Sequence, residues 1–215
     1  MQHLPDDHFI TKLYRRFCNL IYHEASFAYN LTSWVVSGGK WRQWQGLALN
    51  YIQEGKVFEL GCGTGRIVKQ LKENKKDFVA LDYSMEMVKL SKKTALLKEA
   101  KLIRGDGMQL PFKNKSFANI IATFPEQYIV TEECISECAR VLRNDDVKGR
   151  LIIVGRWIVM HNPILKPFFP VFYRQPTEEQ LSEIKSKMSR FDFNVTIHEH
   201  RIGWVSVYVI QADLQ

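Results

Sequence analysis

The segment VFELGCGTGRI, residues 57–67, constrains the fold of this chain more than any other. Its apolar run leads into three glycines at alternating positions, Gly61, Gly63 and Gly65, and apolar residues then recur at the spacing of one helix face. Glycine is needed where the backbone takes a positive φ or where a ligand approaches it closely. The order strand, glycine turn, helix therefore predicts a βα unit of a parallel sheet, with a ligand site beyond the carboxyl ends of the strands.

Strands and helices continue to alternate after this unit. The apolar runs predict strands at 56–60, 77–82, 101–105, 117–124 and 150–157, and Ser84, Thr131 and the pair Thr177 and Gln180 are expected to cap the helices between and after them. The helix after Ser84 is expected to turn Met87, Leu90 and Leu97 inward.

The end of the chain breaks this rhythm. Residues 191–197 alternate between apolar and polar, residues 204–212 are apolar, and a turn around Gly203 joins them, so the two strands are expected to pair antiparallel. The whole pattern predicts an α/β fold: a Rossmann-like, mostly parallel seven-stranded sheet with helices on both faces and a C-terminal antiparallel hairpin.

Three acidic residues follow or end predicted strands and indicate what the loop binds. Glu59 places a carboxylate beside the glycines, where it would repel a pyrophosphate but suit an ammonium group. A dinucleotide fingerprint would also require a small residue at the position of Arg66. Asp82 can accept from ribose hydroxyls, and Asp106 can accept from an adenine amine. The sequence favours a nucleoside ligand that carries an ammonium group and no phosphate.

At this point the chain resembles the class I S-adenosylmethionine-dependent methyltransferases over roughly residues 55 to 212. Four blocks carry the resemblance, in the family's order: ELGCGTG, LDYSMEMV, GDGMQLPFKNKSF and ARVLRNDDVKGRLIIV. The chain departs from the family's pattern at Ala118, where an acid is usual, and at 144–149, where a slightly longer turn replaces Pro-Gly-Gly. Both departures lie outside the cofactor contacts that the resemblance implies.

The resemblance implies that S-adenosylmethionine is the cofactor and assigns its contacts. The three glycines would lie under the methionine part and Glu59 would hold the loop and the amino group, while Asp82 would take the ribose. The remaining contacts would be Tyr83 over the adenine, Asp106 at its amine, Gly107 and Met108 beside the ring, and Thr123 and Phe124 at the sulfonium.

The resemblance also implies methyl transfer, which depends chiefly on bringing the acceptor close to the methyl group. A general base is needed only if the acceptor must lose a proton beforehand. The candidates, each from a segment that the family folds over the cofactor, are His161, Glu126, Tyr128, His23 and Tyr29. The segment FPEQY after the fourth strand matches no known catalytic motif.

We expect a single methyltransferase domain over 1–215. Its parts would be an N-terminal helical cover at 7–53, a cofactor-binding core at 55–157, an insert and helix at 158–190 and a terminal hairpin at 191–212. The cysteines follow no disulfide or zinc spacing, and His198 and His200 have no evident third partner, so no metal is expected. The cysteine usage and the absence of a signal sequence or a membrane span indicate a cytoplasmic protein.

The sequence leaves the acceptor open. Residues 29–44 loosely resemble the N-terminal region of quinone-biosynthesis methyltransferases, and the apolar insert at 163–173 suits a lid, a core segment or an interface. These features favour a small-molecule or lipid-like acceptor, with peripheral membrane contact possible. The net charge of +7 keeps an RNA or protein acceptor open, and a non-catalytic cofactor-binding protein is the third alternative. Both a monomer and a homodimer are compatible with the sequence.

Overall fold

The computed structural model describes residues 37, 39–96, 101–144, 148–162 and 175–215 of the chain. The chain divides into two compact units between Arg42 and Gln43, and the whole sheet belongs to the second. Most of the expected helical cover, the whole 163–173 insert and Leu97 lie outside the described residues. No helix in the described ranges is long and apolar enough to cross a membrane.

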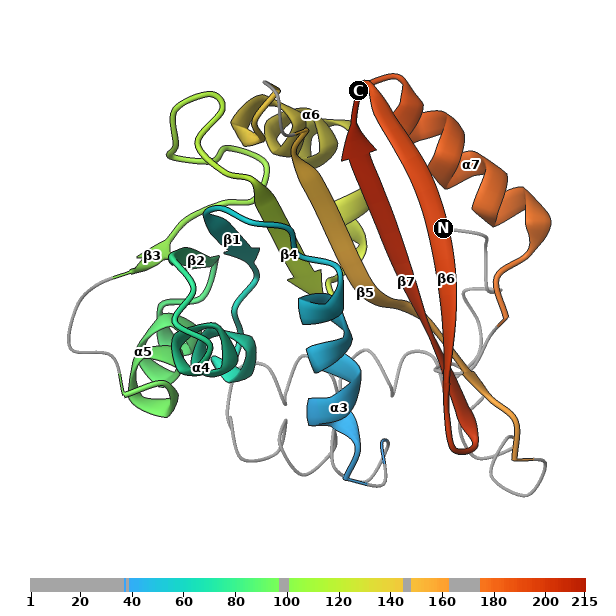
Figure 1. Cartoon of the computed structure of the whole chain (residues 1–215), viewed down its shortest axis with the longest axis horizontal. Helices are drawn as coiled ribbons and strands as arrows, with labels where there is room; N and C mark the ends of the chain where they lie inside the picture. Colours follow the sequence, from blue (N-terminus) through green and yellow to red (C-terminus); the bar gives the residue numbers. More distant parts are fainter. Residues whose placement is uncertain (1–36, 38, 97–100, 145–147, 163–174) are drawn as a thin grey trace, which may run out of the picture. The chain divides into compact units, whose positions relative to one another are not determined.

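Seven strands form one sheet in the order β3-β2-β1-β4-β5-β7-β6 (Figure 1). They are β1 (Val57–Leu60), β2 (Phe78–Asp82), β3 (Leu102–Arg104), β4 (Asn119–Thr123), β5 (Arg150–Met160), β6 (Phe193–Ile202) and β7 (Val205–Leu214). The first five run parallel, and β7 is antiparallel to both β5 and β6. The predicted mostly parallel sheet with a terminal antiparallel hairpin is confirmed.

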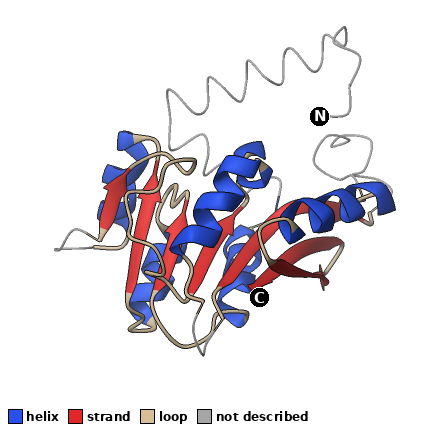
Figure 2. Cartoon of the chain, turned by 90° about the horizontal axis from the view of Figure 1, so that it is seen from above, coloured by secondary structure: helices blue, strands red, loops and turns tan. Residues whose placement is uncertain are grey.

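Helices lie on both sides of this sheet (Figure 2). They are α3 (Trp41–Gly46), η1 (Leu47–Asn50), α4 (Arg66–Glu73), α5 (Met85–Thr94), η2 (Gln127–Val130), α6 (Glu132–Val141) and α7 (Glu178–Ser189). On one face, Ile135 of α6 and Met188 of α7 share a core cluster with Ile120 of β4. Ile67 and Leu71 of α4 are fully buried outside that cluster, because successive strand residues point to opposite faces and each face needs its own cover.

The predicted helix caps are confirmed. The Ser84 side chain accepts from the backbone N–H of Met87, and the Thr131 side chain accepts from that of Cys134. Thr177 and Gln180 form the reciprocal capping box. Each cap satisfies backbone N–H groups that have no partner within the helix, so the sequence fixes where these helices begin.

The prediction for the inner face of α5 was wrong in part. Met87 and Leu90 are only half-buried, and the fully buried residue of the helix is Ser91. A Cβ on Gly65 would lie 2.6 Å from the Ser91 Cα, so the glycine loop and α5 are in direct contact. Such close approach admits only a small side chain, which places serine rather than leucine at the contact.

Several strand ends also differ from the predicted ones, and β6 continues to Ile202 rather than to residue 197. β5 continues beyond the predicted residue 157 to Met160, across an irregularity between Val154 and Ile158 that contains Gly155 at φ 79°. β7 begins at Val205 rather than at Trp204, whose side chain is 65% exposed in the hairpin turn. An inserted residue is left unpaired and bends the strand locally, which hydrophobic periodicity does not report.

The Thr131 cap should contribute measurably to stability. Its hydroxyl accepts from Cys134 N at 3.3 Å and donates to the Tyr128 carbonyl at 2.9 Å. We expect Thr131→Ala to lower the free energy of unfolding by about 1 kcal/mol in chemical denaturation, because both bonds are lost. Thr131→Ser, which keeps the hydroxyl, is the matched control. Equal stability of the two variants would contradict this assignment of the cap.

Candidate functional site

The candidate site lies where the sheet changes its direction of growth. From β1 the chain adds β2 and β3 on one side, and it then returns to add β4 on the other side of β1. The carboxyl ends of β1, β2 and β4 therefore meet at one edge, with the loop after β1 crossing it. Ligands of open α/β sheets bind at such a switch point.

The glycine loop adopts the backbone that the sequence predicts. Gly61, Gly63 and Gly65 have φ values of 78°, 48° and 80°, in the region that side chains disfavour. Gly61 and Gly63 are half-buried and so reachable from solvent, whereas Gly65 is buried against Ser91. Gly61 lies beside the Tyr128 hydroxyl, Gly63 has open space around it, and Gly65 packs against α5.

The loop uses its own N–H groups inside the protein. The N–H groups of Gly61 and Cys62 both donate to the Leu81 carbonyl, at 2.8 and 3.0 Å. Gly63 N–H donates to the Asp82 carboxylate at 2.7 Å, and Gly65 N–H donates to the Cys62 carbonyl at 2.9 Å. Phosphate-binding loops instead direct such N–H groups at the ligand. These four donors are already paired, so this loop does not have the arrangement of a phosphate cradle.

Asp82, for which a ribose contact was predicted, supports the glycine loop. One carboxylate oxygen accepts from Gly63 N–H and the other from Ser84 N–H, at 2.7 and 2.9 Å. Burial raises the pKa of this carboxyl, and the same hydrogen bonds oppose the rise. A single acid therefore joins the end of β2, the start of α5 and the glycine loop.

Glu59 is a buried carboxyl with an unused acceptor. Its side chain is 1% exposed, and its Oε2 atom has no hydrogen-bond partner in the described part of the chain. Burial raises its pKa well above the usual value, and the nearby Asp82 raises it further, while a hydrogen bond from the Val68 backbone lowers it. Val68 is the third residue of α4, where N–H groups lack partners within the helix. A ligand ammonium group would supply the donor that Oε2 lacks and favour the ionised form.

The second loop forms the other border of the site. Asp106 Oδ1 accepts from Met108 N–H at 2.9 Å, which closes a tight turn around buried Gly107. Tyr83 and Met108 are among the large apolar side chains left exposed, at 72% and 44%. Their positions after β2 and β3 are compatible with the adenine contacts that the resemblance implies.

The end of β4 carries an unusual backbone conformation. Phe124 has φ 50°, which is rare for a large side chain and is found mostly where function or packing demands it. Its ring occupies the space beside Gly155, where an added Cβ would lie 2.2 Å from the ring. The Trp44 ring lies 6.4 Å away, tilted by 37°. β4 thus ends at Thr123, and the Phe124 that follows it lies beside the ring of Trp44.

Gln45 lies beside the end of β4, although no sequence pattern predicted it there. Its Nε2 lies 3.4 Å from Thr123 Oγ1, while its Oε1 is buried without a partner in the described ranges. A lone glutamine in a short helix has no motif around it. Only the tertiary structure brings Gln45 and Thr123 together.

The three described general-base candidates do not converge. Tyr128 lies at the glycine loop, with its hydroxyl 3.0 Å from the Cβ position of Gly61. Glu126 is exposed just before η2. His161 follows the extended end of β5, roughly 20 Å along the strand from Val154, and its ring lies 2.7 Å from Ser206 Oγ. This placement does not favour His161 as a base. His23 and Tyr29 lie outside the described residues.

Other reactive side chains have structural surroundings. Cys62, Cys134 and Cys138 are buried and free, and burial raises the pKa of the Cys62 thiol. His200 bonds to Tyr51, and His198 lies 3.2 Å from Gln211. Within the described ranges, no three metal-ligating side chains gather.

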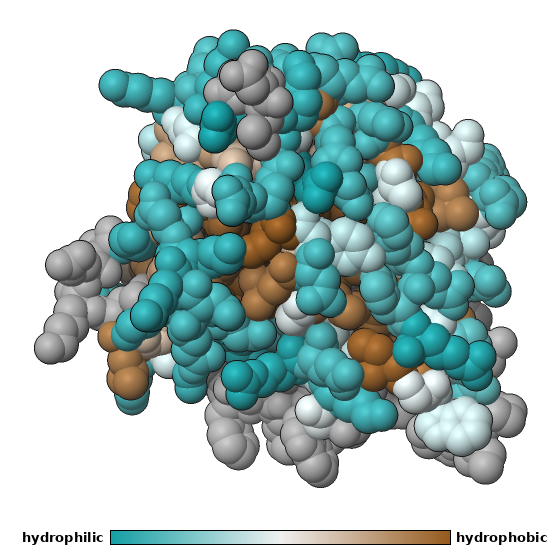
Figure 3. Space-filling view, viewed as in Figure 1, coloured by the Kyte–Doolittle hydropathy of each residue, from teal (hydrophilic) through white to brown (hydrophobic). Residues whose placement is uncertain are grey.

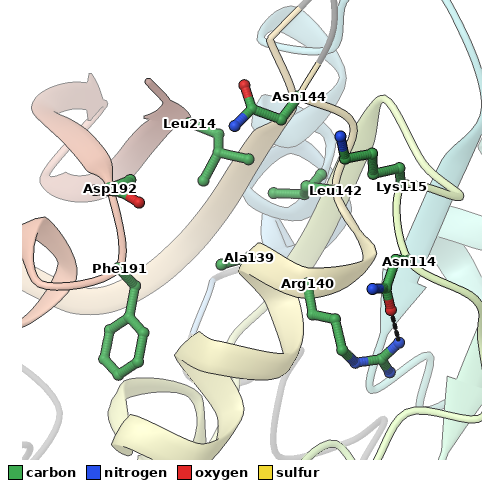
Figure 4. A pocket seen from close by; sticks show the side chains of 9 residues that line it. All are labelled: Asn114, Lys115, Ala139, Arg140, Leu142, Asn144, Phe191, Asp192 and Leu214. Atoms are coloured by element: carbon green, nitrogen blue, oxygen red, sulfur yellow. Dashed lines mark hydrogen bonds between the residues drawn. The ribbon is translucent and has the colours of Figure 1, made fainter.

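Two surfaces lie apart from the site. A hollow lined by Lys115, Arg140, Asp192 and neighbouring residues opens near Leu214, whose N–H donates to Gly149 just before β5 begins (Figure 4). It therefore lies at the amino-terminal end of β5. The left-hand side of the face in Figure 3 is largely hydrophilic. Exposed lysines on α4 and α5, including Lys69, Lys89 and Lys92, contribute to the chain's net charge of +7.

Comparison with known proteins finds one family model. Residues 57–145 match a model described as a methyltransferase domain, and the match includes the glycine loop, Asp82, Asp106 and Thr123. A demethylmenaquinone methyltransferase from Thermotoga maritima is 32% identical over 132 residues, 59% of this chain and 56% of that protein. One from Renibacterium salmoninarum is 28% identical over 147 residues, 67% of this chain and 59% of that protein. The chain thus spans less than two thirds of the length of these relatives.

Solved structures share the fold. A protein from Thermotoga maritima, described as an S-adenosylmethionine-dependent methyltransferase and possible histamine N-methyltransferase, superposes with a TM-score of 0.61. It is 19% identical, and the superposition covers 88% of this chain and 96% of the other. At this identity the likeness shows the architecture.

Glu59 gives a pH-dependent prediction. Its folded pKa lies above the unfolded value, so the ligand-free fold loses stability as the pH rises through the folded pKa. We expect Glu59→Gln to raise the midpoint of thermal unfolding above that of the parent at alkaline pH. The two midpoints should converge near pH 4, where the parent carboxyl is protonated in both states. A variant that is less stable than the parent at alkaline pH would contradict this account of Glu59.

Proposed function

We propose that this chain, which carries a class I S-adenosylmethionine-dependent methyltransferase domain, transfers a methyl group to a small-molecule acceptor with an apolar aromatic ring. The observation that carries the cofactor part is the glycine loop: four of its N–H groups are paired internally, and a buried carboxylate oxygen beside it lacks a donor. Such a loop suits a cationic nucleoside and does not suit a pyrophosphate.

The residues present fit S-adenosylmethionine. Glu59 Oε2 would accept from the amino group, Asp82 from the ribose hydroxyls and Asp106 from the adenine amine, with Gly107 and Met108 beside the ring. Tyr83 would cover the adenine from the β2 side, and Thr123 would face the sulfonium. When bound, this cofactor supplies an electrophilic methyl group on sulfur.

The protein's part in the reaction is placement and exclusion of water. Phe124, Trp44 and Gln45 surround the end of β4, so an acceptor held there would meet a largely apolar wall with one buried amide. Fixing the acceptor close to the methyl group converts a bimolecular step into an effectively unimolecular one. An acceptor that must lose a proton would also need a base, and Glu126 is the described candidate with free access to solvent.

The acceptor proposal rests on two observations. The relatives named above are demethylmenaquinone methyltransferases, although this chain spans only part of their length. In addition, the ring of Phe124 is held at a strained backbone position against Gly155 and beside Trp44, which suits contact with another flat ring. A reduced quinone with an apolar tail has such a flat ring, and it is the class of compound that the names of these relatives indicate.

Cofactor binding is tested with Asp82→Ala. We expect affinity for S-adenosylhomocysteine in calorimetry to fall about tenfold or more, because charge-assisted hydrogen bonds to the ribose are lost. Asp77→Ala is the matched control: Asp77 precedes the same strand at its other end and pairs with Lys101 on the surface. Equal effects of the two substitutions would place the site elsewhere, as would tighter binding of NAD than of S-adenosylhomocysteine by the parent.

The acceptor is tested by following the labelled methyl group of S-adenosylmethionine. We expect transfer to a reduced demethylated naphthoquinone with a short prenyl tail, and none to total RNA or to protein extract. Transfer to RNA or protein would replace the acceptor proposal with that alternative. Binding of the cofactor without transfer to any of the three pools would instead support a non-catalytic cofactor-binding protein.

A further inference from the structure

The described site is rich in acceptors and poor in donors. Glu59, Asp82 and Asp106 all contribute carboxylates, and the four loop N–H groups of Gly61, Cys62, Gly63 and Gly65 already donate within the protein. The proposed cofactor carries its own carboxylate on the amino-acid part. A carboxylate transferred from water into a protein site needs hydrogen-bond donors there.

Tyr128 lies between the two loops of the site. It belongs to η2, after β4, and its side chain reaches back across the end of β1. Its hydroxyl lies 3.0 Å from the Cβ position of Gly61, and its ring lies 3.0 Å from the Cβ position of Gly107. Two glycines from separate loops therefore make room for one tyrosine, which brings its hydroxyl onto the ligand side of the glycine loop.

Hydrogen bonds to its backbone and packing of its ring hold Tyr128 in this position. Its carbonyl accepts from both the N–H and the hydroxyl of Thr131, at 3.0 and 2.9 Å. Its ring packs against the core cluster that contains Leu60 and Cys134. A donor held in place before binding loses little conformational entropy when the ligand arrives.

The hydroxyl is available as a donor. No described residue accepts from it, and Tyr128 is partly buried. Burial raises the pKa of the phenol above its usual value, and the nearby Cys134 and Asp82 add to the rise. The group therefore stays protonated at neutral pH, which suits a hydrogen-bond donor and not a general base.

We propose that the Tyr128 hydroxyl donates a hydrogen bond to the carboxylate of the cofactor's amino-acid part, opposite in role to the Glu59 acceptor. This inference rests on the proposed function, because it assumes that S-adenosylmethionine occupies the site. Tyr128 is then a cofactor-binding residue rather than the general base for which the sequence made it a candidate.

The test compares two ligands on Tyr128→Phe. S-Adenosylhomocysteine carries the amino-acid part, and 5′-methylthioadenosine has the same nucleoside without it. We expect calorimetry to show about a tenfold loss of affinity for the first and a change of less than about twofold for the second. Tyr51→Phe is the matched control, since it removes a hydroxyl that bonds to His200 away from the loop.

Equal losses for both ligands would indicate a structural role for the ring and would overturn the inference, as would no loss for either. If the parent protein bound neither ligand, the proposed function itself would fail. Steady-state kinetics adds a second readout: the KM for S-adenosylmethionine should rise while kcat stays nearly unchanged. A large fall in kcat with unchanged affinity for S-adenosylhomocysteine would instead make Tyr128 the base and contradict the inference.

Discussion

The hydrogen bonds between the glycine loop and the end of β2 are the constraint on which the site depends. Gly61 and Cys62 share the Leu81 carbonyl, and Gly63 donates to the Asp82 carboxylate. These bonds hold the loop in a conformation that only glycine adopts readily. They also use the donors that a phosphate-binding loop would offer to its ligand. One set of contacts thus determines both the shape of the loop and the charge of what it can bind.

The same arrangement explains the electrostatics of the site. Because the loop offers few donors, the carboxyl of Glu59 is buried with one oxygen unpaired, and its pKa rises. Burying such a group costs stability until a cation arrives. The ligand-free fold therefore carries a local disadvantage that a bound ammonium group removes. The preference for a cationic ligand that we propose would follow from the donors that the loop lacks as well as from the acceptors that it presents.

The glycines of the loop make room for different residues. Gly65 makes room for Ser91 of α5, so it sets the distance between the loop and the helix. Gly61 instead makes room for the hydroxyl of Tyr128, as Gly107 does for its ring. The glycine motif is therefore partly a packing motif. The space that side chains would fill at Gly65 and Gly61 is occupied instead by Ser91 of α5 and Tyr128 of η2.

The sequence by itself determined the order of strands and helices, the helix caps, the glycine turn and the acids at the strand ends, because each depends on neighbours within a few residues. The tertiary structure decided which side chains meet across strands. In the structure Ser91 rather than Leu90 is buried, and His161 follows a β5 that is longer than predicted. Gln45 lies beside Thr123, and Tyr128 lies beside Gly61. Such contacts depend on distances between elements far apart in the chain, and local periodicity carries no information about those distances.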